Sequence, residues 1–221
     1  ASWVLAQPCV SSAERPAASY ESSGTKRMAE RLRVIAAASD PRKNTFLSAE
    51  RANIFSQIAK AGTDPKEVLE FRTRYPIELL NSGRPEQSMK EFWELRGFLK
   101  DENLLELNKD LLRRYEVVAF LRLGEQENCL ANHTIESCLF PIQGGGIHTL
   151  QRGSRGAITI LNQWLAEAPS NLSARWWLNI ASMTLGEYPG KVPAQWLIPP
   201  SVFESPYDIK RFHDISGNLG L

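Results

Sequence analysis

Two apolar stretches with helical spacing, within residues 101–189, constrain the fold of this chain more than any other feature. In the first, apolar residues recur every three or four positions, which predicts a helix over 102–123 with one buried face. The second predicts a helix over 152–168, ended by Pro169, and another up to Gly186 that Ser170 or Asn171 caps. The expected buried face of the first helix consists of Leu104, Leu105, Leu107, Leu111, Leu112, Tyr115, Val118, Ala119 and Leu123.

Further helix patterns precede this region. Residues 26–38 and 48–61 show helical periodicity, and Ser48 is the expected N-cap of the second helix. Another helix is expected to begin at Asp64, and a further one to follow the compact turn at 81–85. Two helices around such a turn are similar to the middle of a tetratricopeptide repeat. The sequence therefore predicts an all-α fold, a tetratricopeptide-like, right-handed array of about seven helices.

The predicted organisation has three parts. Residues 1–24, rich in Ser, Ala and Pro, are expected to form a flexible arm. Residues 25–186 form the helical repeat-like domain, with an inserted loop at 124–151 that is too long for a simple helix connection. Five prolines break any long helix in residues 187–221, so we expect an extended C-terminal arm anchored on the helices by aromatic side chains.

Charge and composition argue against several classes of function. With 26 basic and 25 acidic residues the formal net charge is +1, which provides no electrostatic footprint for nucleic acid or an anionic membrane. No stretch of about 18 apolar residues is present, so no transmembrane span is expected. We interpret the densest basic run, Lys26, Arg27, Arg31 and Arg33, as the solvated face of a helix in preference to a phosphate contact.

Two of the three cysteines, Cys129 and Cys138, lie close together in the inserted loop. The preferred interpretation is a disulfide between them, which would stabilise the fold by about 2.5 to 3 kcal/mol by restricting the unfolded chain. Disulfides persist in oxidising compartments, so a periplasmic or secreted protein is expected. For the third, Cys9, a free thiol, a bond to a partner and lipidation all stay open.

The sharper alternative for the loop is a metal site of Cys129, His133, Cys138 and His148, a sulfur and nitrogen set that suits zinc or copper. The spacing of these residues matches no compact zinc-finger pattern. Histidines in loops are also more often exposed or hydrogen-bonded than metal ligands. The disulfide is therefore preferred, and no cofactor is expected.

Gly144, Gly145 and Gly146 could belong to a phosphate-binding loop, because the backbone N–H groups of consecutive glycines can bind an oxyanion. No Lys-Ser or Lys-Thr pair follows them and no convincing buried strand precedes them, so a tight turn packed closely on another segment is favoured. His148 has no nucleophile in a recognisable motif near it, and no elbow motif surrounds Ser154. The sequence therefore predicts that the chain is not an enzyme.

Trp176, Trp177 and Trp196 are the candidate partner-binding residues. Trp176 and Trp177 together would form a stacking platform for a ligand. Helical spacing beside Ile180 instead favours a core position for one of them, with the other supporting the proline-rich arm. Both readings of this pair stay open.

Several ordered segments between residues 125 and 215 form a longer pattern. They are Glu127-Asn128-Cys129, His133, Glu136-Ser137-Cys138, Phe140-Pro141-Ile142, Gly144-Gly145-Gly146-Ile147-His148, Gly153-Ser154-Arg155, Trp177-Leu178-Asn179 and Leu197-Ile198-Pro199-Pro200. In these segments the chain resembles the N-terminal helical region of secreted FG-GAP/VCBS repeat proteins of the ASPIC/UnbV type, similar to cartilage acidic protein. The resemblance implies a tetratricopeptide-like region that precedes a calcium-binding β-propeller. No Asp-x-Asp-x-Asp-Gly calcium loop occurs in the 221 residues, so calcium binding is not carried over.

These patterns predict a non-catalytic protein-protein interaction or scaffolding module of an exported protein. It would bind a protein partner, or the rest of a larger assembly, through a concave helical surface. One alternative is an accessory subunit of a periplasmic or membrane-associated complex. The other is a metal-handling or redox protein that uses the Cys/His loop. No pattern in the sequence identifies the partner or the oligomeric state.

Overall fold

The computed structural model describes residues 23–137, 139–204, 207 and 215–220. The chain divides into two compact units, residues 1–45 and residues 46–221. The described residues contain helices and no strand, which confirms the predicted all-α fold. The predicted N-terminal arm up to residue 22, with Cys9, lies outside the described residues.

The described part of the first unit is dominated by one helix, α1 (Ser23–Ala38). None of its side chains is buried. The sequence predicted a helical domain that starts at residue 25, whereas α1 belongs to the compact unit of residues 1–45 and the other helices to the second unit.

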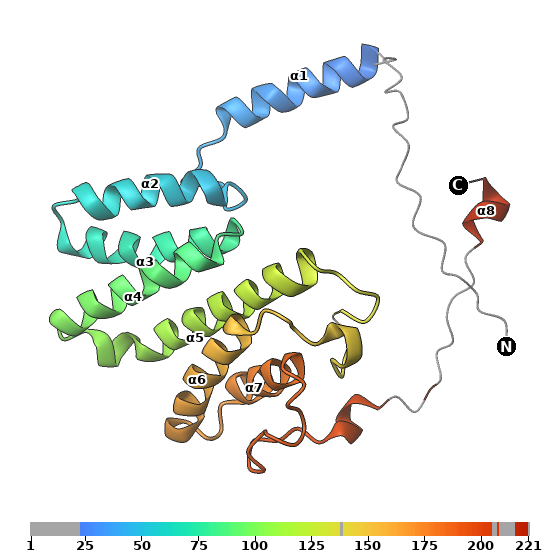
Figure 1. The fold of residues 1–221 in the computed structure, drawn as a ribbon. Coiled ribbons are helices and arrows are strands. Elements are labelled where there is room, and N and C mark those ends of the chain that lie inside the picture. Colours follow the sequence, from blue (N-terminus) through green and yellow to red (C-terminus); the bar gives the residue numbers. More distant parts are fainter. Residues whose placement is uncertain (1–22, 138, 205–206, 208–214, 221) are drawn as a thin grey trace. The chain divides into compact units, whose positions relative to one another are not determined.

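The second unit is an array of helices in which each helix packs against the next one along the chain. Figure 1 shows α2 to α5 as successive antiparallel helices, followed after a loop by α6 and α7. This arrangement confirms helical hairpins, while the finer likeness to tetratricopeptide repeats stays a prediction. The helices are α2 (Ser48–Ala61), α3 (Pro65–Asn81), α4 (Pro85–Asp101), α5 (Leu105–Gly124), α6 (Arg152–Glu167) and α7 (Leu172–Thr184).

Side-chain caps mark the starts of α3 and α7. The Asp64 side chain accepts a hydrogen bond from the backbone N–H of Lys66 at 3.0 Å, and Asn171 accepts one from Ala174 at 3.0 Å, so both act as N-caps. The predicted cap at Ser48 is wrong, because Leu47 occupies the N-cap position of α2 and makes no side-chain capping bond.

The largest buried cluster joins α5, α6, α7 and the segment after α7. A second cluster joins α4 to α5. The predicted buried stripe of α5 is partly wrong, because Leu107 and Leu111 are 84% and 45% exposed, whereas Glu116 and Val117 are buried. Since α5 packs against both α4 and α6, its buried surface covers more than one stripe.

The inserted loop continues directly from α5 as a π-helix (Glu125–Leu130). Asn128 closes the base of the loop. Its amide Nδ2 donates to the carbonyls of Gly124 and Leu150, at 2.9 Å each, and its Oδ1 accepts from the Leu150 N–H at 2.9 Å. The two bonds to Leu150 hold the two ends of the loop together.

The segment after α7 packs against that helix. Trp196 is 8% exposed, and its carbonyl accepts hydrogen bonds from Arg175 Nε at 3.1 Å and Asn179 Nδ2 at 2.9 Å. A short 3-10 turn (Pro200–Phe203) and a short helix, α8 (Ser216–Leu219), follow. None of the described helices has both the length and the apolar character needed to cross a bilayer.

Candidate partner-binding groove

A cavity of about 680 Å³ lies within the second unit, where the turn between α3 and α4 meets the start of α4, the end of α5 and the start of α6. We call it the turn groove. Short connections and the loop bring these segments together, since Arg152 opens α6 immediately after the loop. Its walls are formed by Gly83, Arg84, Pro85, Glu86, Gln87, Lys90, Leu123, Gln126, Glu127 and Arg152.

A second cavity of about 380 Å³ shares Gly83, Pro85 and Gln126 with the turn groove. Its remaining walls are mostly apolar and aromatic, and they come from α3, α5 and the π-helix. The two cavities therefore flank one turn. Five charged residues line the turn groove, whereas the second cavity combines apolar side chains with Arg122 and Glu125. The remaining residues of the second cavity are Leu80, Asn81, Tyr115, Val118, Arg122, Glu125 and Leu130.

Arg152 links two acidic residues across the turn groove. Its Nη1 donates to Glu86 Oε1 at 2.8 Å, and its Nε donates to Glu127 Oε1 at 2.7 Å. Hydrogen bonds to Glu127 and Glu86 raise the pKa of Arg152 further above its ordinary value. Because α4, the π-helix and α6 each contribute one residue, this charge arrangement depends on how the segments pack.

Two buried polar atoms in the groove wall have no hydrogen-bond partner among the described residues. They are Arg84 Nη2 and Glu127 Oε2, one donor and one acceptor. Unpaired buried polar groups cost free energy, so a side-chain movement that brings these two atoms to a ligand with an acceptor and a donor would be favourable. A peptide backbone or a zwitterionic side-chain pair has this chemistry.

The structure brings His148 and Cys129, two of the predicted loop residues, together. His148 is 6% exposed, and its Nε2 lies 3.8 Å from Cys129 Sγ. Its Nδ1 lies 3.3 Å from Ser154 Oγ, which is 2.7 Å from Thr184 Oγ1. Burial lowers the pKa of His148, so the neutral imidazole is favoured in this position. The histidine thus ties the loop to α6 and to the end of α7.

The other two predicted loop residues do not join this pair among the described residues. His133 is exposed, and Cys138 lies outside the described residues. Within the described part of the chain, no group of three His, Cys, Asp or Glu side chains converges to hold a metal ion. The Cys129-Cys138 disulfide and the four-residue metal site both stay predictions.

The three glycines form a 3-10 turn (Gly144–Gly146), as expected for a tight turn. Gly144 has a positive φ of 56°. The Gly145 N–H donates to the carboxylate of Glu136, so a side chain of the loop itself occupies this amide. A Cβ atom on Gly146 would lie 2.7 Å from the Glu136 carbonyl oxygen, which explains why the close approach needs glycine.

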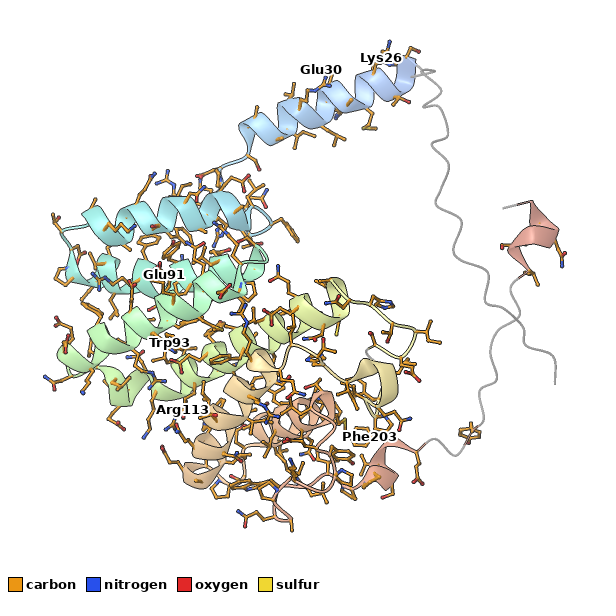
Figure 2. All side chains as sticks on the ribbon, viewed as in Figure 1. Lys26, Glu30, Glu91, Trp93, Arg113 and Phe203 are labelled. Carbon is orange, nitrogen blue, oxygen red and sulfur yellow. The ribbon has the colours of Figure 1, made fainter. Side chains whose placement is uncertain are left out.

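The three candidate tryptophans lie in different surroundings. Trp196 belongs to the buried core, and Trp177 packs beside it with its ring 6.5 Å from Trp164. Trp176 is 41% exposed, with ring centroids 6.1 Å from Phe140 and 5.8 Å from Phe203, which Figure 2 labels. Trp176 therefore joins the loop, α7 and the C-terminal segment while keeping an exposed edge.

No protein-family model, curated protein or solved structure significantly matches this chain. The residues of the turn groove were not among the candidate site residues predicted from the sequence. Arg84, Lys90 and Arg152 belong to no local motif with a known binding chemistry, and Glu127 appears only within the segments of the family resemblance. Only their spatial association indicates a site.

Proposed function

We propose that this chain is a non-catalytic protein-protein interaction module that binds an extended segment of a partner protein in the turn groove. The observation that carries the proposal is the groove itself, about 680 Å³ in volume and walled by charged side chains of both signs. Mixed charges with adjoining apolar surface suit a polypeptide better than a uniformly charged ligand such as nucleic acid.

The unpaired Arg84 and Glu127 atoms support this choice of ligand. The Arg84 guanidinium suits a carboxylate or carbonyl of the partner, and the Glu127 carboxylate suits an amide or a lysine. Apolar side chains of the partner would lie beyond the turn, in the adjoining cavity of about 380 Å³. Helical hairpins supply the rigid walls that such a groove needs.

The test is affinity capture from the native source with the wild-type chain and two charge-reversal variants. Lys90→Glu changes an exposed residue of the groove wall, and Lys100→Glu changes an exposed residue of the same helix outside the groove. We expect the wild type and Lys100→Glu to retain the same stoichiometric partner. Lys90→Glu should bind it at least about tenfold more weakly, because the new carboxylate would repel the acidic group of the partner that the Lys90 ammonium attracts.

Equal capture of the same partner by Lys90→Glu and the wild type would rule out the turn groove as the binding site. Recovery of the chain from its native source without any stoichiometric partner would contradict the interaction function. Circular dichroism of both variants checks that the helical array is retained.

We further propose, as predicted from the sequence, that the module is exported, with Cys129 bonded to Cys138, and that it corresponds to the helical region of an ASPIC/UnbV-type protein. Support for this part comes from the sequence segments alone. Intact mass measured before and after reduction and alkylation tests the disulfide. Metal analysis of the untreated protein tests the competing Cys/His metal site, since two alkylatable thiols with stoichiometric metal would contradict the disulfide.

A further inference from the structure

A further cavity, of about 180 Å³, lies among α2, α3 and α4 and shares no residue with the turn groove. We call it the three-helix cavity. Figure 1 shows α3 between α2 and α4, so residues of α3 line the middle of the cavity and residues of α2 and α4 line its two sides. The walls are formed by Ser56, Ala59, Lys60, Arg72, Tyr75, Glu91, Glu94 and Leu95.

Charges of opposite sign line different walls of the three-helix cavity. Glu91 and Glu94 come from α4. Lys60 comes from α2 and Arg72 from α3. Among the described residues, none of these four side chains forms an ion pair. Arg72 lies over the Phe98 ring, 4.3 Å from its centroid, a contact that leaves guanidinium N–H groups available to an acceptor.

The two carboxylates of the cavity lie close enough to affect each other. Burial and the neighbouring Glu94 carboxylate raise the pKa of Glu91, which Figure 2 labels. Lys60 acts in the opposite direction but does not compensate for these two effects. The acidic side of the cavity therefore lacks positive charge, and the ammonium group of a ligand would supply it.

The opposite walls offer donors for an anion. The Tyr75 hydroxyl accepts a hydrogen bond from Gln87 Nε2 at 3.2 Å, so its own O–H group can donate to a ligand. With Lys60 and Arg72, three side chains of the cavity can donate to a carboxylate. α2 and α4 each add one apolar side chain.

We propose that the three-helix cavity binds a free amino acid. The ammonium group of this ligand would pair with the two carboxylates of α4, and its carboxylate would pair with the basic side chains of α2 and α3. The volume of about 180 Å³ lies below the range of about 300 to 1,000 Å³ typical for drug-sized ligands, so a small molecule suits the cavity. A zwitterion supplies both of the charges that the walls leave unpaired. The inference does not depend on the turn groove, whose walls are formed by other residues.

The test is isothermal titration calorimetry of the full chain with L-leucine, whose aliphatic side chain suits the apolar residues of the cavity. Isoamylamine and isocaproate are the matched ligands, because each is leucine without one of its two charged groups. We expect leucine to bind, and each matched ligand to bind at least about tenfold more weakly, because one set of charge-assisted hydrogen bonds is lost. Absence of leucine binding at about 10 mM, or equal binding of leucine and either matched ligand, would overturn the proposal.

Two variants test whether leucine binds between these charges. Glu91→Gln removes a charge from the acidic side and Lys60→Gln removes one from the basic side, and each should weaken leucine binding at least about tenfold. Glu50→Gln on α2 and Lys100→Gln on α4 make the same changes at exposed positions outside the cavity, so both should bind leucine as the wild type does. If either cavity variant binds leucine as tightly as the wild type, the proposal is wrong. Circular dichroism of all four variants checks that the helices are retained.

Discussion

Gly153 allows α6 to cross α5 at close range. A Cβ atom at this position would lie 2.5 Å from the carbonyl oxygen of Phe120 and 2.6 Å from the backbone nitrogen of Gly124. Backbone atoms cannot move aside as a flexible side chain can. Gly153→Ala should therefore force the helices apart and lower the free energy of unfolding by about 1 to 3 kcal/mol, measured by urea denaturation.

Gly97→Ala is the matched control for this prediction. Gly97 lies inside α4, and nothing is within 4 Å of where its Cβ would be. Alanine favours the helix over glycine, so this variant should be more stable than the wild type by about 0.5 to 1 kcal/mol. Equal stability of the two variants would mean that close packing of α5 and α6 is not the reason why position 153 needs glycine.

His148 predicts a pH dependence of stability. Its ordinary pKa is 6.5, and burial lowers that value in the folded chain, so the unfolded chain takes up the proton first as the pH falls. The stabilisation is fully present above pH 6.5 and declines as the pH drops towards the lowered pKa, with a slope of at most about 1.4 kcal/mol per pH unit. Urea denaturation at pH 7 and pH 5 measures this loss.

His148→Asn should show a smaller loss of stability between these two pH values than the wild type. His133→Asn, at an exposed position of the same loop, keeps the buried imidazole and should keep the wild-type dependence. The same loss in wild type and His148→Asn would mean that other groups cause the pH dependence.

At the scale of elements, a buried ion pair joins α2 to α3. Arg51 Nε donates to Glu78 Oε1 at 2.7 Å, and the two side chains are 8% and 9% exposed. Removing one partner leaves a buried charge without its counterpart. Arg51→Met should therefore lower the free energy of unfolding by about 3 to 5 kcal/mol, measured by urea denaturation.

The double variant Arg51→Met with Glu78→Leu distinguishes a missing partner from lost packing. Apolar replacement of both members of a buried pair is often neutral or stabilising, so we expect most of the stability to return. A double variant as unstable as Arg51→Met would show that the arginine acts through packing, for instance against the Phe55 ring 4.9 Å away.

The helices themselves were largely predictable, because periodicity, capping residues and prolines act over a few neighbouring positions. Asp64 and Asn171 cap the helices that the sequence assigned to them. The buried face of α5 was harder to predict. Leucine at 107 and 111 fits the helical period, but which face is covered depends on where α4 and α6 lie.

At the scale of the whole molecule, the chain forms two compact units. The turn groove lies in residues 46–221, whereas α1, which has no buried side chain, lies in residues 1–45.

The residues of the turn groove could not be grouped into one site from the sequence, because they lie far apart along the chain. Arg152 pairs with Glu86, which lies 66 residues earlier in the chain, and with Glu127, 25 residues earlier. Each of these residues alone resembles an ordinary charged surface residue. No spacing within one helix or loop could have placed them in a common site.

The sequence by itself determined that this protein is built from helices, where most of them begin and end, and that a glycine turn lies in a long loop, because these features follow from interactions between near neighbours. Only the tertiary structure decided that His148 is buried beside Ser154, that Trp196 belongs to the core and that the groove residues meet. Contacts between distant segments depend on how all the helices pack together, and that packing is a property of the whole chain.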